Sequence, residues 1–250
     1  MSFSPVLASD HIYDKYKRYL RTIFSIDNEN YNQQFHKLLE DKASFAKGPY
    51  LEVQDSFEKG KSVAELIDEG MLPKEFRKIG MPQQRPLYKH QEVALRKAAA
   101  GANLVVSTGT GSGKTESFMI PILAHIIWEH EDGKLTPGVR ALLIYPMNAL
   151  ANDQVERLRI LLADYPQITY GSYTGQTKHR YQEALADYLE LNDGKKPLPN
   201  ELISRDQMKE TPPHLLITNY AMLEYLMVRP GDNILFSGEY ADYWKYRHRG

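Results

Sequence analysis

The stretch STGTGSGKT, residues 107–115, decides how this chain is expected to fold. It follows a short apolar run at residues 103–106 and opens an apolar segment at residues 117–128. A strand, a glycine-rich loop, Lys-Thr and a helix, in that order, are typical of a phosphate-binding P-loop. The glycines let successive backbone N–H groups turn toward one anion, and the positive end of the new helix points at the same place. The stretch therefore predicts a nucleotide site in an α/β domain.

The side chains of this P-loop have distinct expected roles. Lys114 is expected to reach the outer phosphates, and the hydroxyl of Thr115 to hold Mg²⁺. One position departs from the usual spacing, because Thr108 stands where Gly or Ala is expected, five residues before Gly113. A glycine-rich surface turn is the alternative interpretation. The residues predicted to bind ATP and Mg²⁺ here are Thr110, Gly111, Ser112, Gly113, Lys114, Thr115 and Glu116.

The composition is that of an ordinary globular protein. The 250 residues suit one large or two modest domains, and 42% of them are hydrophobic while 25% are charged. The formal net charge of −1 creates no global positive field. Any contact with nucleic acid must then come from a local patch or from backbone N–H groups.

Several classes of protein are disfavoured by the same numbers. The sequence has no cysteine, which excludes disulfides and thiolate metal sites and fits a reducing cytosol. Its first residues lack the apolar core of a signal peptide, and no apolar run reaches membrane-spanning length. The histidines show no plausible ligand set for a metal. We expect a soluble, cytoplasmic protein without membrane contact.

Residues 1–80 are predicted to form a mainly helical N-terminal extension, ahead of an α/β domain at residues 81–250. Apolar side chains recur at helical spacing from Ile12 to Ile23, and a second helix is expected at residues 30–45. Residues 50–57 look extended, Ser62 is expected to cap a short helix, and Gly70 to end it. The tyrosines and basic residues near the start suit either a nucleic-acid backbone or an amphipathic helix packed on the next domain.

From residue 82 onward, apolar runs alternate with helical patterns. This alternation predicts a parallel sheet with helices on both faces. Residues 191–213, which contain several prolines, are expected to form a long surface loop or insertion with a little helix of its own. The expected strands are residues 104–106, 139–145, 168–173 and 215–217, and the expected helices are residues 92–100, 116–129, 149–162, 178–189 and 221–228.

Three polar clusters directly follow the expected strands, at residues 146–154, 174–177 and 218–223. Ligands of an open α/β sheet bind where strands end and helices begin. Hydroxyl and amide side chains beside free helix N–H groups suit the phosphates of a nucleic-acid strand. Helix capping explains any single cluster, whereas three beside a P-loop favour a binding surface. The predicted nucleic-acid contacts are Pro146, Asn148, Gln154, Thr174, Gly175, Thr177, Thr218 and Asn219.

Together the motifs LYKHQ, TGTGSGKT, YPMNALANDQ, TGQT and TNYAML resemble, in this order, the first RecA-like domain of superfamily 2 helicases of the DEAD/DEAH-box type. The resemblance covers residues 82–225 and implies a RecA-like P-loop NTPase fold of class α/β. It implies that Gln91, which offers both a donor and an acceptor, reads adenine. It also implies that Lys114 and Thr115 serve the ATP chemistry and that the three later motifs line the nucleic-acid path.

Residues 48–72 look like the leader of large bacterial helicases, a group that includes DNA-repair enzymes and subunits of phage-defence systems such as DISARM. This resemblance favours DNA over RNA as the partner.

Hydrolysis in these helicases also needs an acidic motif II, in which an aspartate orients Mg²⁺ and a glutamate positions the attacking water. We find no such motif: residues 68–69 precede the P-loop, and Asp164 follows a stretch with helical spacing. Motif III, the second RecA-like domain and its arginine fingers are absent as well. We therefore expect the chain to be truncated before motif II, to bind ATP with negligible turnover, and to need a C-terminal lobe or partner subunits.

Two other functions stay open. The chain is alternatively a non-catalytic RecA-like module that docks a partner protein, or a piece of the motor subunit of a restriction or defence complex.

Overall fold

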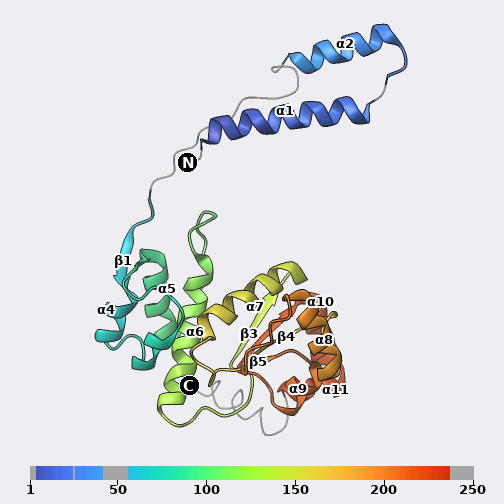
Figure 1. Cartoon of the computed structure of the whole chain (residues 1–250). Helices are drawn as coiled ribbons and strands as arrows, with labels where there is room; N and C mark the ends of the chain where they lie inside the picture. Colours follow the sequence, from blue (N-terminus) through green and yellow to red (C-terminus); the bar gives the residue numbers. More distant parts are fainter. Residues whose placement is uncertain (1–3, 25, 42–55, 237–250) are drawn as a thin grey trace. The chain divides into compact units, whose positions relative to one another are not determined.

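The computed structural model describes residues 4–24, 26–41 and 56–236. The chain divides into two compact units, Met1–Ser56 and Phe57–Gly250, which are described separately (Figure 1). The domain limits expected from the sequence, 1–80 and 81–250, stay a prediction.

The first unit contains two helices, α1 (Pro5–Ile23) and α2 (Glu29–Glu40). Asn28 caps α2 by accepting hydrogen bonds from the backbone N–H groups of its first turn. The hydroxyl of Tyr13 donates to the Leu39 carbonyl at 3.1 Å, which ties the two helices together. The helical N-terminal region is thus confirmed. However, α2 ends at Glu40, and the expected helix at 42–45 and most of the expected extended segment lie outside the described residues.

The second unit begins with an antiparallel pair of short strands, β1 (Lys59–Ser62) and β2 (Pro86–Tyr88). Between them lie α4 (Val63–Asp68) and the 3₁₀ helix η1 (Lys74–Lys78), and α5 (Lys89–Ala99) follows β2. Ser62 caps α4 as expected, in a reciprocal capping box with Glu65.

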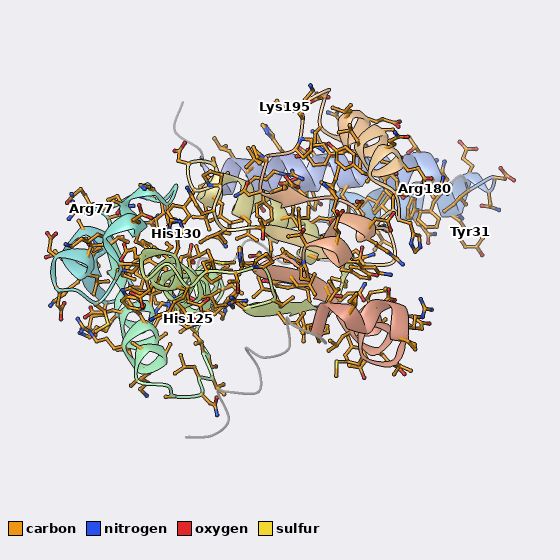
Figure 2. All side chains as sticks on the ribbon, turned by 90° about the horizontal axis from the view of Figure 1, so that it is seen from below. Tyr31, Arg77, His125, His130, Arg180 and Lys195 are labelled. Atoms are coloured by element: carbon orange, nitrogen blue, oxygen red, sulfur yellow. The ribbon has the colours of Figure 1, made fainter. Side chains whose placement is uncertain are left out.

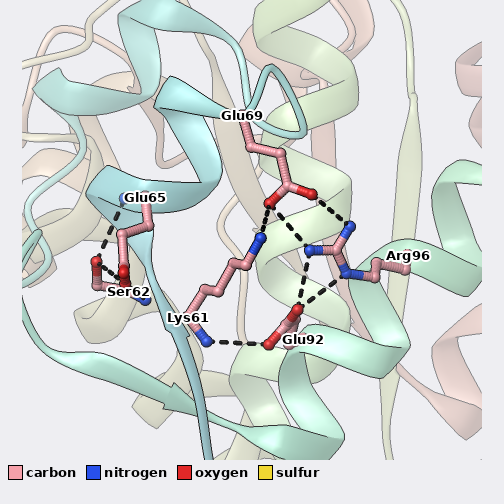
Figure 3. A network of polar contacts seen from close by, with 6 residues as sticks. All are labelled: Lys61, Ser62, Glu65, Glu69, Glu92 and Arg96. Carbon is pink, nitrogen blue, oxygen red and sulfur yellow. Dashed lines mark hydrogen bonds and ion pairs between the residues drawn. The ribbon is translucent and has the colours of Figure 1, made fainter.

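A network of charges joins β1, α4 and α5 (Figure 3). Glu92 accepts a hydrogen bond from the Lys61 backbone N–H at 2.9 Å and pairs with Arg96. Arg96 also binds Glu69, whose carboxylate meets the Lys61 ammonium at 2.7 Å. Hydrogen bonds from Arg96 and Lys61 lower the pKa of Glu69 to about 2. The network fixes α5, and α5 in turn carries Gln91.

A parallel sheet forms the centre of the unit, with strand order β3-β6-β4-β5. Its strands are β3 (Ala141–Tyr145), β4 (Tyr170–Tyr173), β5 (Glu201–Leu202) and β6 (Leu215–Asn219). The remaining helices are α6 (Lys114–Glu131), α7 (Asn148–Leu162), α8 (Tyr181–Leu191), α9 (Arg205–Glu210), α10 (Tyr220–Val228), α11 (Pro230–Asn233) and the 3₁₀ turn η2 (Ile234–Phe236).

Both faces of this sheet are covered, as the alternating pattern predicts. Leu215 and Ile217 lie in one hydrophobic core with α6 and α7, and Leu216 lies in a second core with α9 and α10. Side chains of a strand alternate between faces, so β6 alone feeds both cores. The interval 191–213 contains a helix of its own, α9, and additionally the strand β5.

One expected strand is wrong. Residues 104–106 form no strand, and the side chain of Val105 is 98% exposed. The reason is the absence of a neighbour: among the described residues, β3 pairs with β6 alone, and no strand lies against residues 104–106. An extended run gains ladder hydrogen bonds only when another strand is beside it. The described helices also include none with the length and apolar composition to span a bilayer.

His214 pins the start of β6 to two neighbouring segments. Its Nδ1 accepts a hydrogen bond from the Thr169 backbone N–H at 2.9 Å, and its Nε2 lies 3.2 Å from the Thr136 carbonyl. Nε2 must then carry the proton and donate, because a carbonyl only accepts. Protonation of Nδ1 would remove the acceptor for Thr169. Burial and the nearby Arg140 charge lower the pKa of His214 to about 4.

We expect this histidine to make the fold sensitive to acid. Because the pKa of His214 is lower in the folded chain than the ordinary 6.5, the unfolded chain binds the proton first. The free energy of unfolding should therefore fall by up to about 3 kcal/mol between pH 7 and pH 4 on account of this group. Urea unfolding of wild type and His214→Gln over this pH range measures the effect. Equal pH slopes for the two proteins would contradict it, and His11→Gln, at an exposed position, serves as the control.

Candidate nucleotide site and nucleic-acid edge

The P-loop leads directly into the first turn of α6. Gly111 and Gly113 have φ angles of +75° and +70°, in the left-handed region that glycine tolerates. Gly113 is the N-cap of α6, and no side chain caps this end of the helix. A Cβ on Gly113 would lie 2.4 Å from Nε2 of Gln91, so the position requires glycine. The positive, uncapped start of α6 is suited to an anion.

Lys114 and the unusual Thr108 both stabilise this loop. The Lys114 ammonium donates to the Gly109 carbonyl at 2.9 Å, so the side chain lies along the loop. Hydroxyls of Thr108 and the fully buried Ser112 lie 2.6 Å apart. Thr108 thus supplies a side-chain bond across the loop at a position where glycine or alanine is usual.

Gln91 connects α5 to the P-loop. Its side chain is buried: Oε1 accepts from the Tyr88 backbone N–H at 2.8 Å, and Nε2 donates to the Gly113 carbonyl at 2.8 Å. His90 lies beside it, with Nε2 3.0 Å from the Ser112 carbonyl. The structure therefore shows that Gln91 lies against the loop and braces it. Its reading of adenine stays a prediction.

A cavity of about 750 Å³ opens between residues 80–88, the P-loop with the start of α6, and the C-terminal part of α7. We call it the P-loop cavity. Met81, Pro82 and Leu123 give it apolar walls, whereas Lys114 and Thr115 lie at its polar end. Its volume and mixed lining are typical of a site for a small organic ligand. An apolar wall beside a phosphate cradle suits a nucleotide, with its base on the wall.

Arg157 is a cavity residue that the sequence did not reveal. It projects from α7 and pairs with Glu116 Oε1 at 2.9 Å, next to Thr115. The other oxygen of Glu116 is buried and has no hydrogen-bond partner among the described residues. An unpartnered carboxylate oxygen beside Thr115 fits the oxygen ligands that Mg²⁺ prefers. One feature of the sequence could have identified Arg157 as a site residue. It lies three residues after Gln154, a predicted site residue, and therefore on the same face of the helix.

We expect Arg157→Met to weaken the binding of ATP–Mg²⁺ on the order of tenfold, because the Glu116 charge would then face the phosphates without compensation. Titration calorimetry of the two proteins measures the change. Arg159→Met is the matched control, since Arg159 lies two residues further along α7 and pairs with Glu201 instead. Unchanged affinity in Arg157→Met, or an equal loss in Arg159→Met, would contradict this role.

The three polar clusters meet at the carboxyl ends of β3, β6 and β4, which we call the carboxyl edge. Asn219 donates through Nδ2 to Oδ1 of Asn148 at 2.6 Å, and its own Oδ1 caps α10. Thr218 donates to the Tyr173 carbonyl at 2.7 Å. Parallel register places these strand ends side by side. The expected convergence of the clusters is therefore present.

Burial separates the residues of this edge into two groups. Thr174 and Thr218 are 4% and 0% exposed, and their hydroxyls bond within the protein. They hold the edge together. The others reach the surface wholly or partly, and these are Pro146, Asn148, Gln154, Gly175, Thr177 and Asn219.

The two histidines of α6 pair with acids. His125 and His130 lie on this helix (Figure 2), 3.1 Å from Glu129 and from Glu75 respectively. The described residues contain no group of three His, Asp or Glu side chains arranged to hold a metal ion.

A parallel sheet with helices on both faces and a glycine-rich loop at an uncapped helix start together define a RecA-like P-loop domain. Residues 88–195 match the model of the DEAD/DEAH box helicase family. These residues are thus similar to a helicase domain of the DEAD/DEAH box type.

Similar proteins agree with this assignment. The chain is 29% identical to Druantia protein DruE of Escherichia coli over 303 aligned positions, which cover 88% of this chain and 16% of DruE. It is 30% identical to ATP-dependent helicase Lhr-Core of Methanothermobacter thermautotrophicus over 56% of this chain and 15% of that protein. The crystal structure of DUF1998 helicase MrfA bound to DNA shares the fold, with a TM-score of 0.51 and 22% identity over 74% of this chain and 22% of MrfA. The chain thus spans about a sixth of the curated relatives.

Proposed function

We propose that this chain binds ATP–Mg²⁺ in the P-loop cavity and a nucleic-acid strand along the carboxyl edge. It would act as the first RecA-like lobe of an ATP-dependent helicase or translocase. The observation that carries this proposal is the uncapped start of α6, where Lys114 lies along the loop beside a cavity braced by Gln91. On binding, Lys114 would exchange the Gly109 carbonyl for phosphate oxygens, and Thr115 would hold Mg²⁺. The ion supplies charge neutralisation of the phosphates.

Lys114→Ala should weaken the binding of ATP–Mg²⁺ by roughly 100-fold, because a charged hydrogen bond to the phosphates is lost. Titration calorimetry with and without Mg²⁺ tests this. Lys134→Ala, at the far end of α6 where Lys134 pairs with Asp132, should bind like wild type. Wild-type affinity in Lys114→Ala would contradict a phosphate site at the P-loop.

We also propose that this chain alone binds ATP with negligible turnover. Its sequence offers no Asp-Glu pair after an apolar strand to orient Mg²⁺ and water. Release of inorganic phosphate, measured with and without single-stranded DNA, is expected to stay at the rate of the Lys114→Ala protein. Turnover that depends on Lys114 would contradict this part of the proposal.

We propose that the nucleic acid is DNA. We also propose that the protein acts in phage defence, in the cytoplasm. The DNA-bound MrfA structure supports DNA as the partner. The resemblance of residues 48–72 to repair and defence helicases supports both DNA as the partner and a role in phage defence. The accessible groups of the carboxyl edge are small polar side chains, which suit sugar–phosphate contacts.

Asn219→Ala should lower the affinity for a single-stranded DNA 20-mer about fivefold, because it removes both the cap of α10 and the tie to Asn148. Fluorescence anisotropy at fixed salt measures this, with an RNA of the same sequence as comparison. Asn32→Ala, on α2, is the control and should leave the affinity unchanged. Tighter binding of the RNA would overturn the choice of DNA, and wild-type binding by Asn219→Ala would remove the carboxyl edge from the contact.

A second candidate function is the docking of a partner protein. It is favoured by the free edge of β3: in the described sheet this strand pairs on one side only, and Ile144 is 46% exposed. Open strand edges pair readily with another chain. Nucleotide titration separates the two functions, because a docking module needs no Mg²⁺-dependent affinity for ATP. The same docking edge would also fit the other alternative, in which the chain is part of the motor subunit of a restriction or defence complex.

A further inference from the structure

Arg205, the first residue of α9, holds both ends of one surface loop. Its backbone N–H donates to the Lys178 carbonyl at 2.9 Å, and its Nη2 donates to the Thr174 carbonyl at 2.9 Å. The residue is only 8% exposed. We call residues 174–178 the edge loop, because they follow β4 at the carboxyl edge. Arg205 lies outside the residues 88–195 that match the helicase family model.

The edge loop has a defined shape with open donors. The Thr177 hydroxyl donates to the Ser172 carbonyl at 2.8 Å and accepts from the Thr174 N–H at 2.9 Å. The backbone N–H groups of Gly175 and Lys178 have no acceptor within the part of the chain that the structure describes. Both of these residues are exposed. Backbone donors held in a fixed turn at the surface are suited to phosphate oxygens.

Helix α9 places two cations, Arg205 and Lys209, beneath the edge loop. The Arg205 guanidinium lies over the ring of Tyr173 at 5.1 Å, and Lys209, one turn further along α9, pairs with Asp232 at 2.8 Å. Asp232 also accepts from the Tyr173 hydroxyl at 2.6 Å. Burial would raise the pKa of Asp232, but hydrogen bonds from Lys209 and Tyr173 lower it, so this carboxylate is charged. Lys209 pairs with this carboxylate, and the charge of Arg205 also acts on it.

One donor of Arg205 remains open. Its Nε is buried and has no hydrogen-bond partner among the described residues. A buried donor without a hydrogen-bond partner carries a desolvation cost. A phosphodiester on the edge loop would add a second negative charge near this guanidinium.

We propose that Arg205 is a positioning residue: it clamps the edge loop so that the N–H groups of Gly175 and Lys178 receive a phosphate of the nucleic-acid strand. The inference rests on the proposed binding of nucleic acid at the carboxyl edge. It adds a residue from α9 that none of the motifs contains.

The test compares Arg205→Met, Arg205→Lys and Arg159→Met in the full chain. Arg205→Met keeps an apolar stem but loses the bond to Thr174 and the charge, so its affinity for a single-stranded DNA 20-mer should fall about tenfold. Arg205→Lys keeps the charge and should recover part of the loss. Arg159→Met also removes a half-buried arginine, from its bond to Glu201, and should bind DNA within twofold of wild type. ATP–Mg²⁺ affinity in the same samples should stay within twofold throughout, which a general loss of structure would not allow.

Hydrogen exchange of the edge loop provides a readout without nucleic acid. Exchange at the hydrogen-bonded N–H groups of Thr174, Gln176 and Thr177 should rise at least tenfold in Arg205→Met and stay unchanged in Arg159→Met. Unchanged exchange, or wild-type DNA affinity in Arg205→Met, would overturn the clamp. If wild type itself binds no nucleic acid, the proposed function fails, and the exchange experiment still decides whether Arg205 holds the loop.

Discussion

One buried amide, that of Gln91, supports the arrangement of the candidate nucleotide site. It holds the Tyr88 N–H with its oxygen and the Gly113 carbonyl with its nitrogen, each at 2.8 Å. The first bond sets where α5 begins, and the second sets where the P-loop turns into α6. Because Gly113 has a left-handed φ and no room for a side chain, the chain leaves the loop in one direction only. The open N–H groups of α6, the wall of the P-loop cavity and Lys114 all depend on this brace.

Helix α7 connects the cavity with the carboxyl edge. It begins at Asn148, which bonds to Asn219 at that edge, and it carries Arg157 into the P-loop cavity. Nine residues of helix separate the two positions, or about 14 Å along its axis. A displacement of α7 on binding one ligand would therefore be felt at the other site. Helix α7 thus links the P-loop cavity to the carboxyl edge.

The sequence predicted those features that depend on residues close together in the chain. Apolar runs located β3, β4 and β6, and the glycines located the P-loop, because both signals depend on neighbours in the chain. The sequence did not predict features that depend on contacts between residues far apart in the chain. Residues 104–106 have strand character but no partner strand in the described sheet. The bond from Arg157 to Glu116 spans 41 residues and that from Arg205 to Thr174 spans 31, so the local sequence pattern identifies neither pair of partners.

The central claim is that nucleotide binds between Gln91 and the start of α6. Hydrogen exchange of the full chain with and without ATP–Mg²⁺, read by mass spectrometry, tests it most directly. We predict slower exchange at residues 109–117 and 85–91 when nucleotide is present, with the exposed surface of α2 unaffected. Unchanged exchange at residues 109–117 under saturating ATP–Mg²⁺, or protection confined to another part of the chain, would contradict the account.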